Sequence, residues 1–199
     1  MIFKTSVLKK MMKTAYNGNG LYACNQKGRI ILAGGWWCLS VEEGVFPKKA
    51  KAALVELLGE LPAAGESFRC TSAGNQMEMP LFDLMKEIEE VNWEDQYERK
   101  GLILESGAGL IRPYQNDTET IFLSELITDL MDGTVEPGED EGLSGPGKIR
   151  SQDNMVFMET DTCSIAVWEI KASEDDGASF SGRNKLMQDL STLKLPVSR

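Results

Sequence analysis

Apolar residues recur every three or four positions near the start of the chain, a spacing that predicts an amphipathic helix over residues 5–16. The apolar positions of this helix are Val7, Leu8, Met11, Met12 and Ala15. A hydroxyl side chain at Thr5 or Ser6 is expected to cap the first turn, because it can accept a hydrogen bond from an otherwise unpaired amide. The run Asn17-Gly18-Asn19-Gly20 is expected to end the helix.

A second amphipathic helix is predicted after Pro47, a residue that the first turn of a helix tolerates. Its apolar stripe consists of Ala50, Ala53, Leu54, Leu57, Leu58 and Leu61. Gly59 and Pro62 are expected to end it. Short runs rich in β-prone residues predict strands between and after the two helices, at Leu21–Asn25, Arg29–Ala33, Trp36–Val41, Phe68–Ser72 and Gln76–Leu81.

Beyond residue 81 the apolar positions continue at helical spacing, but acidic residues fill the positions between them. Strands are predicted at Leu102–Leu104 and Leu110–Arg112. A further helix is predicted to start at a capping Thr118 or Thr120 and to reach Met131, with Phe122 and Leu123 on its core face. Residues 132–147 are rich in glycine and acidic side chains and are predicted to form a loop. The remaining expected elements are a hairpin of Met155–Glu159 and Ser164–Ile170 and a short terminal helix within Lys185–Leu195.

This order of elements predicts an α+β fold in which antiparallel sheets carry packed helices. We expect two halves of similar size, joined near residue 82. Residues 1–81 form a basic helix–sheet domain, residues 82–171 an acidic helix–sheet domain, and residues 172–199 a flexible tail with a short terminal helix.

The formal net charge of −10 is distributed unevenly along the chain. Residues 1–70 contain ten Lys and Arg against five Asp and Glu, a net charge of +5. Residues 71–141 contain four against 18, a net charge of −14, and residues 142–199 contain seven against eight. The sequence therefore predicts two electrostatically distinct faces or domains.

Histidine is absent, which removes the commonest general base near neutral pH and the usual activators of serine and cysteine nucleophiles. The four cysteines show no CxxC pair, and they are interpreted as buried free thiols of a cytoplasmic protein. The chain also has no apolar run long enough to predict a membrane helix or a signal peptide. These features favour a binding protein without catalytic residues, metal or other cofactor, and without a membrane partner.

Lysines on the two N-terminal helices are the candidate DNA-binding residues: Lys9, Lys10 and Lys13 on the first, and Lys48, Lys49 and Lys51 on the second. Ammonium groups along a helix can lie against phosphates, with an affinity that does not depend on base sequence and falls as salt rises. A solvated helix face is the alternative interpretation of the same lysines.

Two groups of residues are candidates for binding a protein partner. Trp36 and Trp37 are adjacent, so in a strand they point to opposite faces, and the exposed one can anchor an interface. The second group consists of carboxylates of the acidic half, which can imitate the phosphates of nucleic acid: Glu87, Glu89, Glu90, Glu94 and Asp95.

The first 81 residues resemble a domain of a DNA sliding clamp of the bacterial and phage β type. The opening run Phe3–Ala15 looks like the first helix of such a domain. Phe46–Pro62 is similar to its second helix, and Gln76–Leu81 to its closing strand. The resemblance implies helices that line a ring around DNA, sheets that form the rim, recruitment of a protein partner, a role in DNA replication and a homo-oligomer. The chain departs from β-type clamps in having room for two domains instead of three.

Two further hypotheses come from other functional classes. An acidic inhibitor of the kind that phages and mobile elements encode, a DNA mimic similar in action to anti-CRISPR proteins, would use residues 83–141 to block the nucleic-acid groove of a nuclease or another host protein. A carboxylate-dependent metal enzyme would need no histidine, but it would bind a divalent cation.

Overall fold

The computed structural model describes residues 4–74, 76–79, 97–106, 109–131, 148–152, 154–171 and 181–196. The helices are α1 (Thr5–Asn17), α2 (Lys48–Leu58), α4 (Glu125–Met131) and α5 (Ser181–Ser191). The strands are β1 (Leu21–Gln26), β2 (Arg29–Ala33), β3 (Trp37–Glu42), β4 (Ser67–Cys70), β5 (Gln76–Glu78), β6 (Glu98–Arg99), β7 (Leu104–Ser106), β8 (Gly109–Gln115), β9 (Thr120–Ser124), β10 (Lys148–Gln152), β11 (Met155–Glu159) and β12 (Cys163–Trp168).

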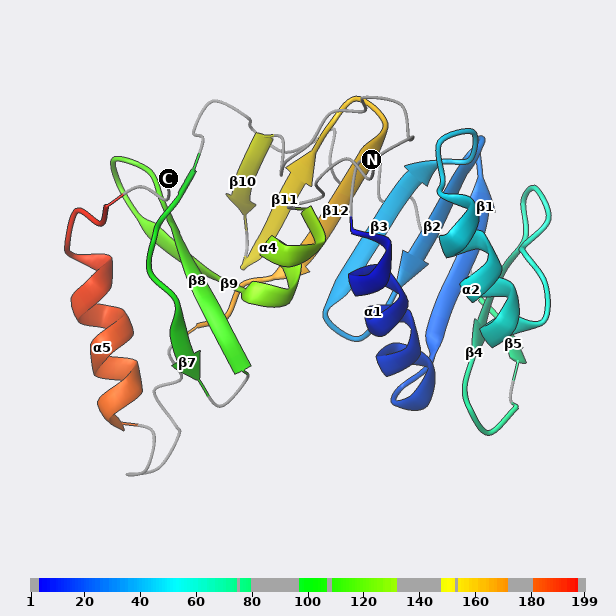
Figure 1. Cartoon of the computed structure of the whole chain (residues 1–199), viewed down its shortest axis with the longest axis horizontal. Helices are drawn as coiled ribbons and strands as arrows, with labels where there is room; N and C mark the ends of the chain where they lie inside the picture. Colours follow the sequence, from blue (N-terminus) through cyan, green and yellow to red (C-terminus); the bar gives the residue numbers. More distant parts are fainter. Residues whose placement is uncertain are drawn as a thin grey trace.

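Strands from both halves of the chain form one eight-stranded sheet in the order β10-β11-β12-β3-β2-β1-β4-β5 (Figure 1). Its two parts meet where β12 pairs antiparallel with β3, in a register that runs from Cys163 opposite Val41 to Val167 opposite Trp37. All its neighbouring strands are antiparallel, which confirms the predicted α+β class with antiparallel sheets. The predicted boundary near residue 82 therefore separates two stretches of chain whose strands share a sheet.

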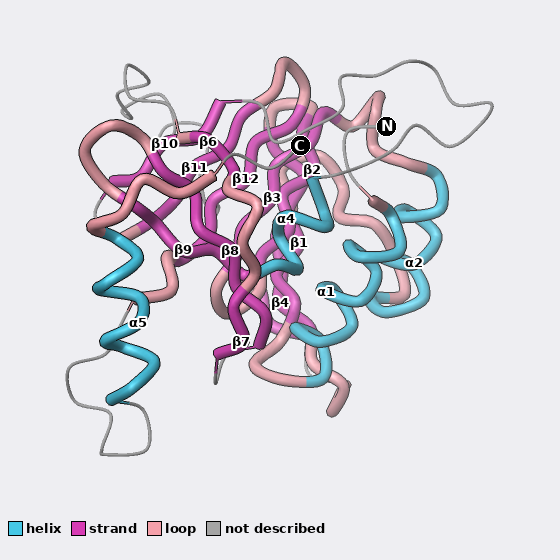
Figure 2. The backbone as a smooth tube through the Cα atoms, turned by 60° about the vertical axis from the view of Figure 1, so that its left-hand side comes forward, coloured by secondary structure: helices cyan, strands magenta, loops and turns pink. Residues whose placement is uncertain are grey.

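Helices α1, α2 and α4 cover one face of this sheet (Figures 1 and 2). The apolar stripe of α1 is buried as its periodicity predicts, and Leu8 and Met12 have no exposed surface. These side chains pack in the main core against alternate residues of the strands, such as Leu21 and Ala23 of β1. The N-terminus of α1 also contacts the end of α4, because the Lys4 amide donates a 2.7 Å hydrogen bond to the Leu130 carbonyl.

The second sheet is smaller and has β8 at its centre, with β6 and β7 on one side and β9 on the other. Helix α5 lies beside it, on the other side of the strands from α1 and α2 (Figure 2). Met187 of α5 packs against Ile111 and Phe122, in a cluster separate from the main core.

Several boundaries agree closely with the sequence pattern. Helix α2 begins directly after Pro47 and ends at Gly59, which takes a positive φ of 87° that glycine adopts without strain. The predicted strand at residues 36–41 corresponds to β3. The terminal helix predicted within 185–195 corresponds to α5, which starts earlier, at Ser181, and ends at Ser191. All four cysteines are free and buried, as expected. The helix expected after Phe82 and the loop at 132–147 lie outside the described residues.

The helix predicted from Thr118 or Thr120 to Met131 is wrong in its first half. Residues Thr120–Ser124 form strand β9, and only Glu125–Met131 are helical. Pairing with β8 satisfies the backbone of β9, and its side chains at 121–123 are all buried, so tertiary contacts override the helical spacing. The hydroxyl of Ser124 accepts a hydrogen bond from the Leu126 amide and thereby caps α4.

Two smaller expectations also need correction. Neither Thr5 nor Ser6 caps α1: Lys4 occupies the capping position, and no side chain makes a capping hydrogen bond there. Strand β10 has no counterpart among the predicted elements, although it pairs along its whole length with β11. Its sequence, Lys-Ile-Arg-Ser-Gln, contains a single apolar residue, so hydrophobic patterning could not identify it.

Candidate DNA-facing surface and partner groove

The three candidate lysines of α1 lie on the side of the helix away from the sheet. Lys9, Lys10 and Lys13 are exposed, whereas Leu8, Met11, Met12 and Ala15 are buried. The separation follows from 3.6 residues per turn, which places the lysines together opposite the apolar stripe. Helix α1 contains no Asp or Glu, so its solvent face carries only positive charge.

The candidate lysines of α2 cluster in its first turn. Lys48 and Lys49 are exposed, and Lys51 is partly buried. Positive charge at a helix N-terminus opposes the helix dipole and costs a few tenths of a kcal/mol per residue. The stability of α2 therefore does not explain why three lysines occupy this turn.

Helices α1 and α2 pack side by side in one layer (Figure 1), so the two lysine groups belong to neighbouring helices of that layer. We call the six residues Lys9, Lys10, Lys13, Lys48, Lys49 and Lys51 the lysine face. Helix α2 adds one carboxylate, Glu56, further along its length. Within these two helices, positive charge is therefore concentrated on α1 and the first turn of α2.

Helix α4 belongs to the same layer, and its acidic residues, counted from the sequence, would oppose DNA. The Glu125 carboxylate, however, forms a two-point ion pair with Arg112 of β8, with N–O distances of 2.6 and 2.7 Å. Both side chains are largely buried, at 11% exposed for Arg112 and 15% for Glu125. The other acidic residue of α4, Asp129, is exposed to solvent.

The predicted acidic partner residues, Glu87, Glu89, Glu90, Glu94 and Asp95, lie outside the described residues. The prediction that the two tryptophans point to opposite faces of one strand does not apply, because β3 begins at Trp37 and Trp36 lies in the bend before it. Trp37 is 4% exposed and belongs to the main core, whereas Trp36 is partly buried, packs against that core and lines a groove.

This groove, which we call the tryptophan groove, has a volume of about 370 Å³ and lies at the junction of β3 and β12. The Trp168 amide donates a 3.0 Å hydrogen bond to the Trp36 carbonyl, and the Trp168 side chain is 51% exposed. Apolar side chains dominate the lining, which consists of Tyr22, Ala33, Gly34, Gly35, Trp36, Trp37, Cys38, Met79, Met155, Ala166 and Trp168.

The tryptophan groove opens on the face of the sheet opposite the helices. Along β1, Leu21 and Ala23 belong to the main core, whereas Tyr22 and Cys24 belong to a second cluster on the other face. Sequence reasoning missed Trp168, although its position at the end of a β-prone run was available as a signal. It also missed Met79 and Met155, which reach the groove from other parts of the sheet.

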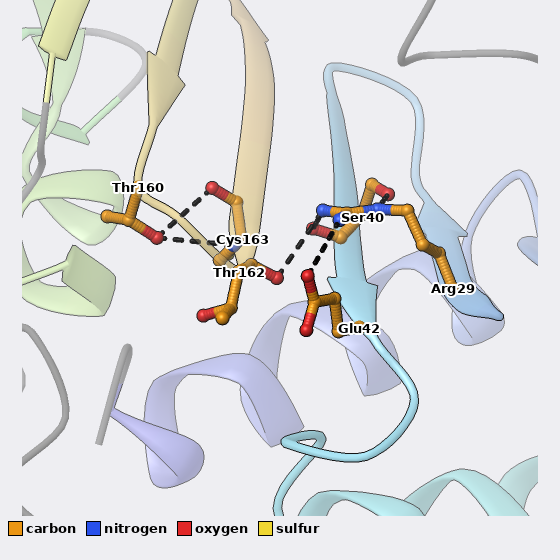
Figure 3. Close-up of polar contacts among 6 residues, drawn as sticks. All are labelled: Arg29, Ser40, Glu42, Thr160, Thr162 and Cys163. Atoms are coloured by element: carbon orange, nitrogen blue, oxygen red, sulfur yellow. Dashed lines mark hydrogen bonds and ion pairs between the residues drawn. The ribbon is translucent and has the colours of Figure 1, made fainter.

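The opposite end of the β3–β12 junction is held by Arg29 (Figure 3). Its guanidinium donates to the Ser40 hydroxyl at 2.7 Å, to the Ser40 carbonyl at 3.2 Å and to the Thr162 carbonyl at 3.4 Å. The Glu42 amide also donates to the Thr162 carbonyl, at 3.0 Å. Because Thr162 belongs to the second half of the chain and the other residues to the first, these bonds link the two halves beside the pairing of β3 with β12.

Two of the four buried cysteines, Cys38 and Cys163, have thiols that ionise less readily than a free cysteine. Burial raises the pKa of Cys38 to about 12, with a smaller contribution from nearby Cys24. Burial also raises the pKa of Cys163 to about 12. Neither side chain is a thiolate at neutral pH. Within the described ranges, no group of three or more Cys, Asp or Glu side chains is arranged to hold a metal ion.

No described helix combines the length and the apolar character required to cross a lipid bilayer. Comparison with models of known protein families finds no match, and no curated protein matches the sequence.

Proposed function

We propose that this chain is a non-catalytic, clamp-like protein that holds the backbone of duplex DNA against its lysine face and binds a protein partner in its tryptophan groove. The observation that carries the proposal is the lysine face itself: six lysines, five of them exposed, on two neighbouring helices, one of which has no carboxylate. Such a surface suits phosphates spaced along a duplex, whatever the base sequence.

Two further features support this function. Helices α1, α2 and α4 lie on one face of the eight-stranded sheet, and in a clamp-like protein such a layer of helices would face the DNA. Pairing of Glu125 with Arg112 also removes one of the charges that would repel DNA from α4. The proposal assigns DNA and protein to opposite faces of the sheet, so both can be bound at once.

Reversing the charge of α1 tests the DNA contact. We expect the variant Lys9→Glu, Lys10→Glu, Lys13→Glu to bind duplex DNA roughly tenfold more weakly or worse, and the slope of log affinity against log salt to fall by roughly 2 to 3. The measurement is fluorescence anisotropy of a labelled duplex over a series of KCl concentrations.

A variant of equal net charge controls for the overall electrostatic change. Lys171→Glu, Lys185→Glu, Lys194→Glu reverses three exposed lysines that lie outside the lysine face, and it should keep most of the affinity. Equal loss in both variants, or no loss in the α1 variant, would contradict the assignment. If the protein stays bound to circular DNA and is released when the DNA is linearised, the protein encircles the DNA as well as contacting it.

Trp168→Glu tests the tryptophan groove, because it places a charge on an apolar surface without disturbing the core. We expect it to remove a partner protein that co-purifies with the wild type from the native host and survives nuclease treatment. Val45→Glu, at an exposed apolar position beyond the other end of β3, is the matched control.

The acidic-inhibitor hypothesis makes the converse prediction in the same experiment. There, Glu87→Lys, Glu89→Lys, Glu90→Lys would abolish partner binding, and Trp168→Glu would leave it unchanged.

A further inference from the structure

The C-terminal segment, residues 181–196, is attached to the smaller sheet in the manner of a bound peptide. Gln115, at the end of β8, is 9% exposed and uses both ends of its side-chain amide on the backbone of this segment. Its Nε2 donates to the Leu193 carbonyl at 2.6 Å, and its Oε1 accepts from the Leu195 amide at 3.0 Å. The Gly101 amide adds a 3.0 Å hydrogen bond to the Pro196 carbonyl.

These contacts recognise an extended backbone and not particular side chains. The Gln115 side-chain amide accepts a hydrogen bond from one backbone N–H of the segment and donates one to a backbone C=O two residues earlier. It thereby makes the hydrogen bonds that the backbone of a neighbouring strand would make. Gln115 is held ready for this role, because its Nε2 also donates to the Thr120 hydroxyl at 2.9 Å. The surface under the segment, defined by Gly101, Leu104, Ile111, Gln115, Phe122 and Ile170, is called the docking face.

Few side chains of the segment are buried, and one more, Leu190, is partly buried beside Met187. Met187 and Leu195 are 7% and 8% exposed, whereas Leu186 and Leu193 are 47% and 54% exposed. Met187 belongs to the small cluster with Ile111 and Phe122, and none of the described residues of the segment belongs to the main core. Detaching the segment would therefore open a local cluster and leave the main core and the eight-stranded sheet intact.

We propose that the C-terminal segment is a displaceable internal ligand, and that the docking face binds a helix-plus-extended segment of a partner protein in its place. The partner segment would carry an apolar residue on a short amphipathic helix and a second one in the extended stretch, corresponding to Met187 and Leu195. Because the internal ligand is tethered, its effective concentration at the docking face is of the order of mM. A partner segment must therefore bind the docking face tightly enough to displace the tethered segment. This inference is independent of the DNA contact proposed above.

A labelled peptide of residues 181–196 tests the proposal in trans. In the full-length variant Met187→Asp, Leu195→Asp, the internal copy is weakened and the docking face is unchanged, so we expect this variant to bind the peptide about tenfold more tightly than the wild type, or better. The matched variant Leu186→Asp, Leu193→Asp changes the exposed leucines and should resemble the wild type. Adding Gln115→Ala to the first variant should weaken peptide binding again by about tenfold.

Several results would overturn the inference. A folded Met187→Asp, Leu195→Asp variant that does not bind the peptide would show that the docking face is not a peptide site. Equal binding to the wild type and both variants would place the peptide elsewhere. Concentration-dependent dimers of the wild type that vanish in the Met187→Asp, Leu195→Asp variant would assign the docking face to a second copy instead of a partner.

Hydrogen exchange of the wild type provides a test that needs no variant. The Leu195 and Gly101 amides should exchange much faster than amides in the centre of β3, because local detachment suffices to expose them. Exchange of the Leu195 amide as slow as that of β3 would mean that the segment opens only when the protein unfolds globally, and the proposal would fail.

Discussion

Replacing Trp37 with alanine is expected to lower the free energy of unfolding by about 3–5 kcal/mol, the usual cost of truncating a buried large aromatic side chain. The indole is 4% exposed and fills the space between β3 and α1. A Cβ atom built on Gly34 would lie 2.5 Å from the indole Nε1 and 3.1 Å from the Cβ of Ala15, so the ring lies tightly between the turn before β3 and the helix. Alanine would leave a cavity that neither neighbour can close.

Urea denaturation followed by circular dichroism measures this effect without relying on the fluorescence of the residue removed. Trp168→Ala is the matched control, because its side chain is 51% exposed, and we expect it to cost less than about 1 kcal/mol. Similar losses for the two variants would show that Trp37 does not hold α1 on the sheet. The comparison also separates stability from the proposed partner binding, since Trp168 is the exposed tryptophan of the groove and Trp37 is buried in the core.

Glu125→Ala is expected to destabilise the protein by about 3 kcal/mol, because it leaves the guanidinium of Arg112 largely buried without its counter-charge. The two groups meet at 2.6 and 2.7 Å, and a further nitrogen of Arg112 donates to the Lys100 carbonyl at 3.0 Å. The pair joins the smaller sheet to α4 of the helix layer. Its loss should therefore weaken the packing of α4 as well as global stability.

The double variant Arg112→Leu, Glu125→Leu should be more stable than Glu125→Ala, since it removes both charges and retains apolar volume. Glu42→Ala is the surface control: its carboxylate is 3.8 Å from Arg29 and its side chain is 47% exposed, so we expect a loss below about 1 kcal/mol. Thermal and urea unfolding of the four proteins provide the comparison. A loss for Glu125→Ala no larger than that for Glu42→Ala would mean that the pair is electrostatically screened.

The same residue has a consequence for the proposed DNA contact. From the sequence, Glu125 and Asp129 of α4 both count against DNA on the helix layer. The structure leaves Asp129 exposed but turns Glu125 toward Arg112. Charge counted along the chain therefore overstates the negative charge that α4 presents, because counting ignores which carboxylates are paired.

By itself the sequence determined the elements whose side chains repeat with a clear period. Helices α1 and α2 follow from apolar stripes ended by glycine, and the hairpin of β1 and β2 follows from two β-prone runs around a turn. The same periodicity placed Lys9, Lys10 and Lys13 together on the solvent side of α1. It predicted opposite faces for Trp36 and Trp37 only if both lay in one strand, and β3 begins at Trp37. These features depend on neighbours within a few residues, and local pattern reports them well.

Only the tertiary structure decided how distant segments meet. Residues 121–123 share a helical spacing with the apolar positions of α4, yet they form a strand because β8 supplies backbone partners and both faces become buried. The pairing of β12 with β3, the groove that Trp168 completes there, and the hold of Gln115 on Leu193 and Leu195 join residues about 80 to 130 positions apart. Such contacts depend on which surfaces remain to be buried once the local elements have formed. The sequence pattern within either segment therefore does not predict which distant segment it will contact.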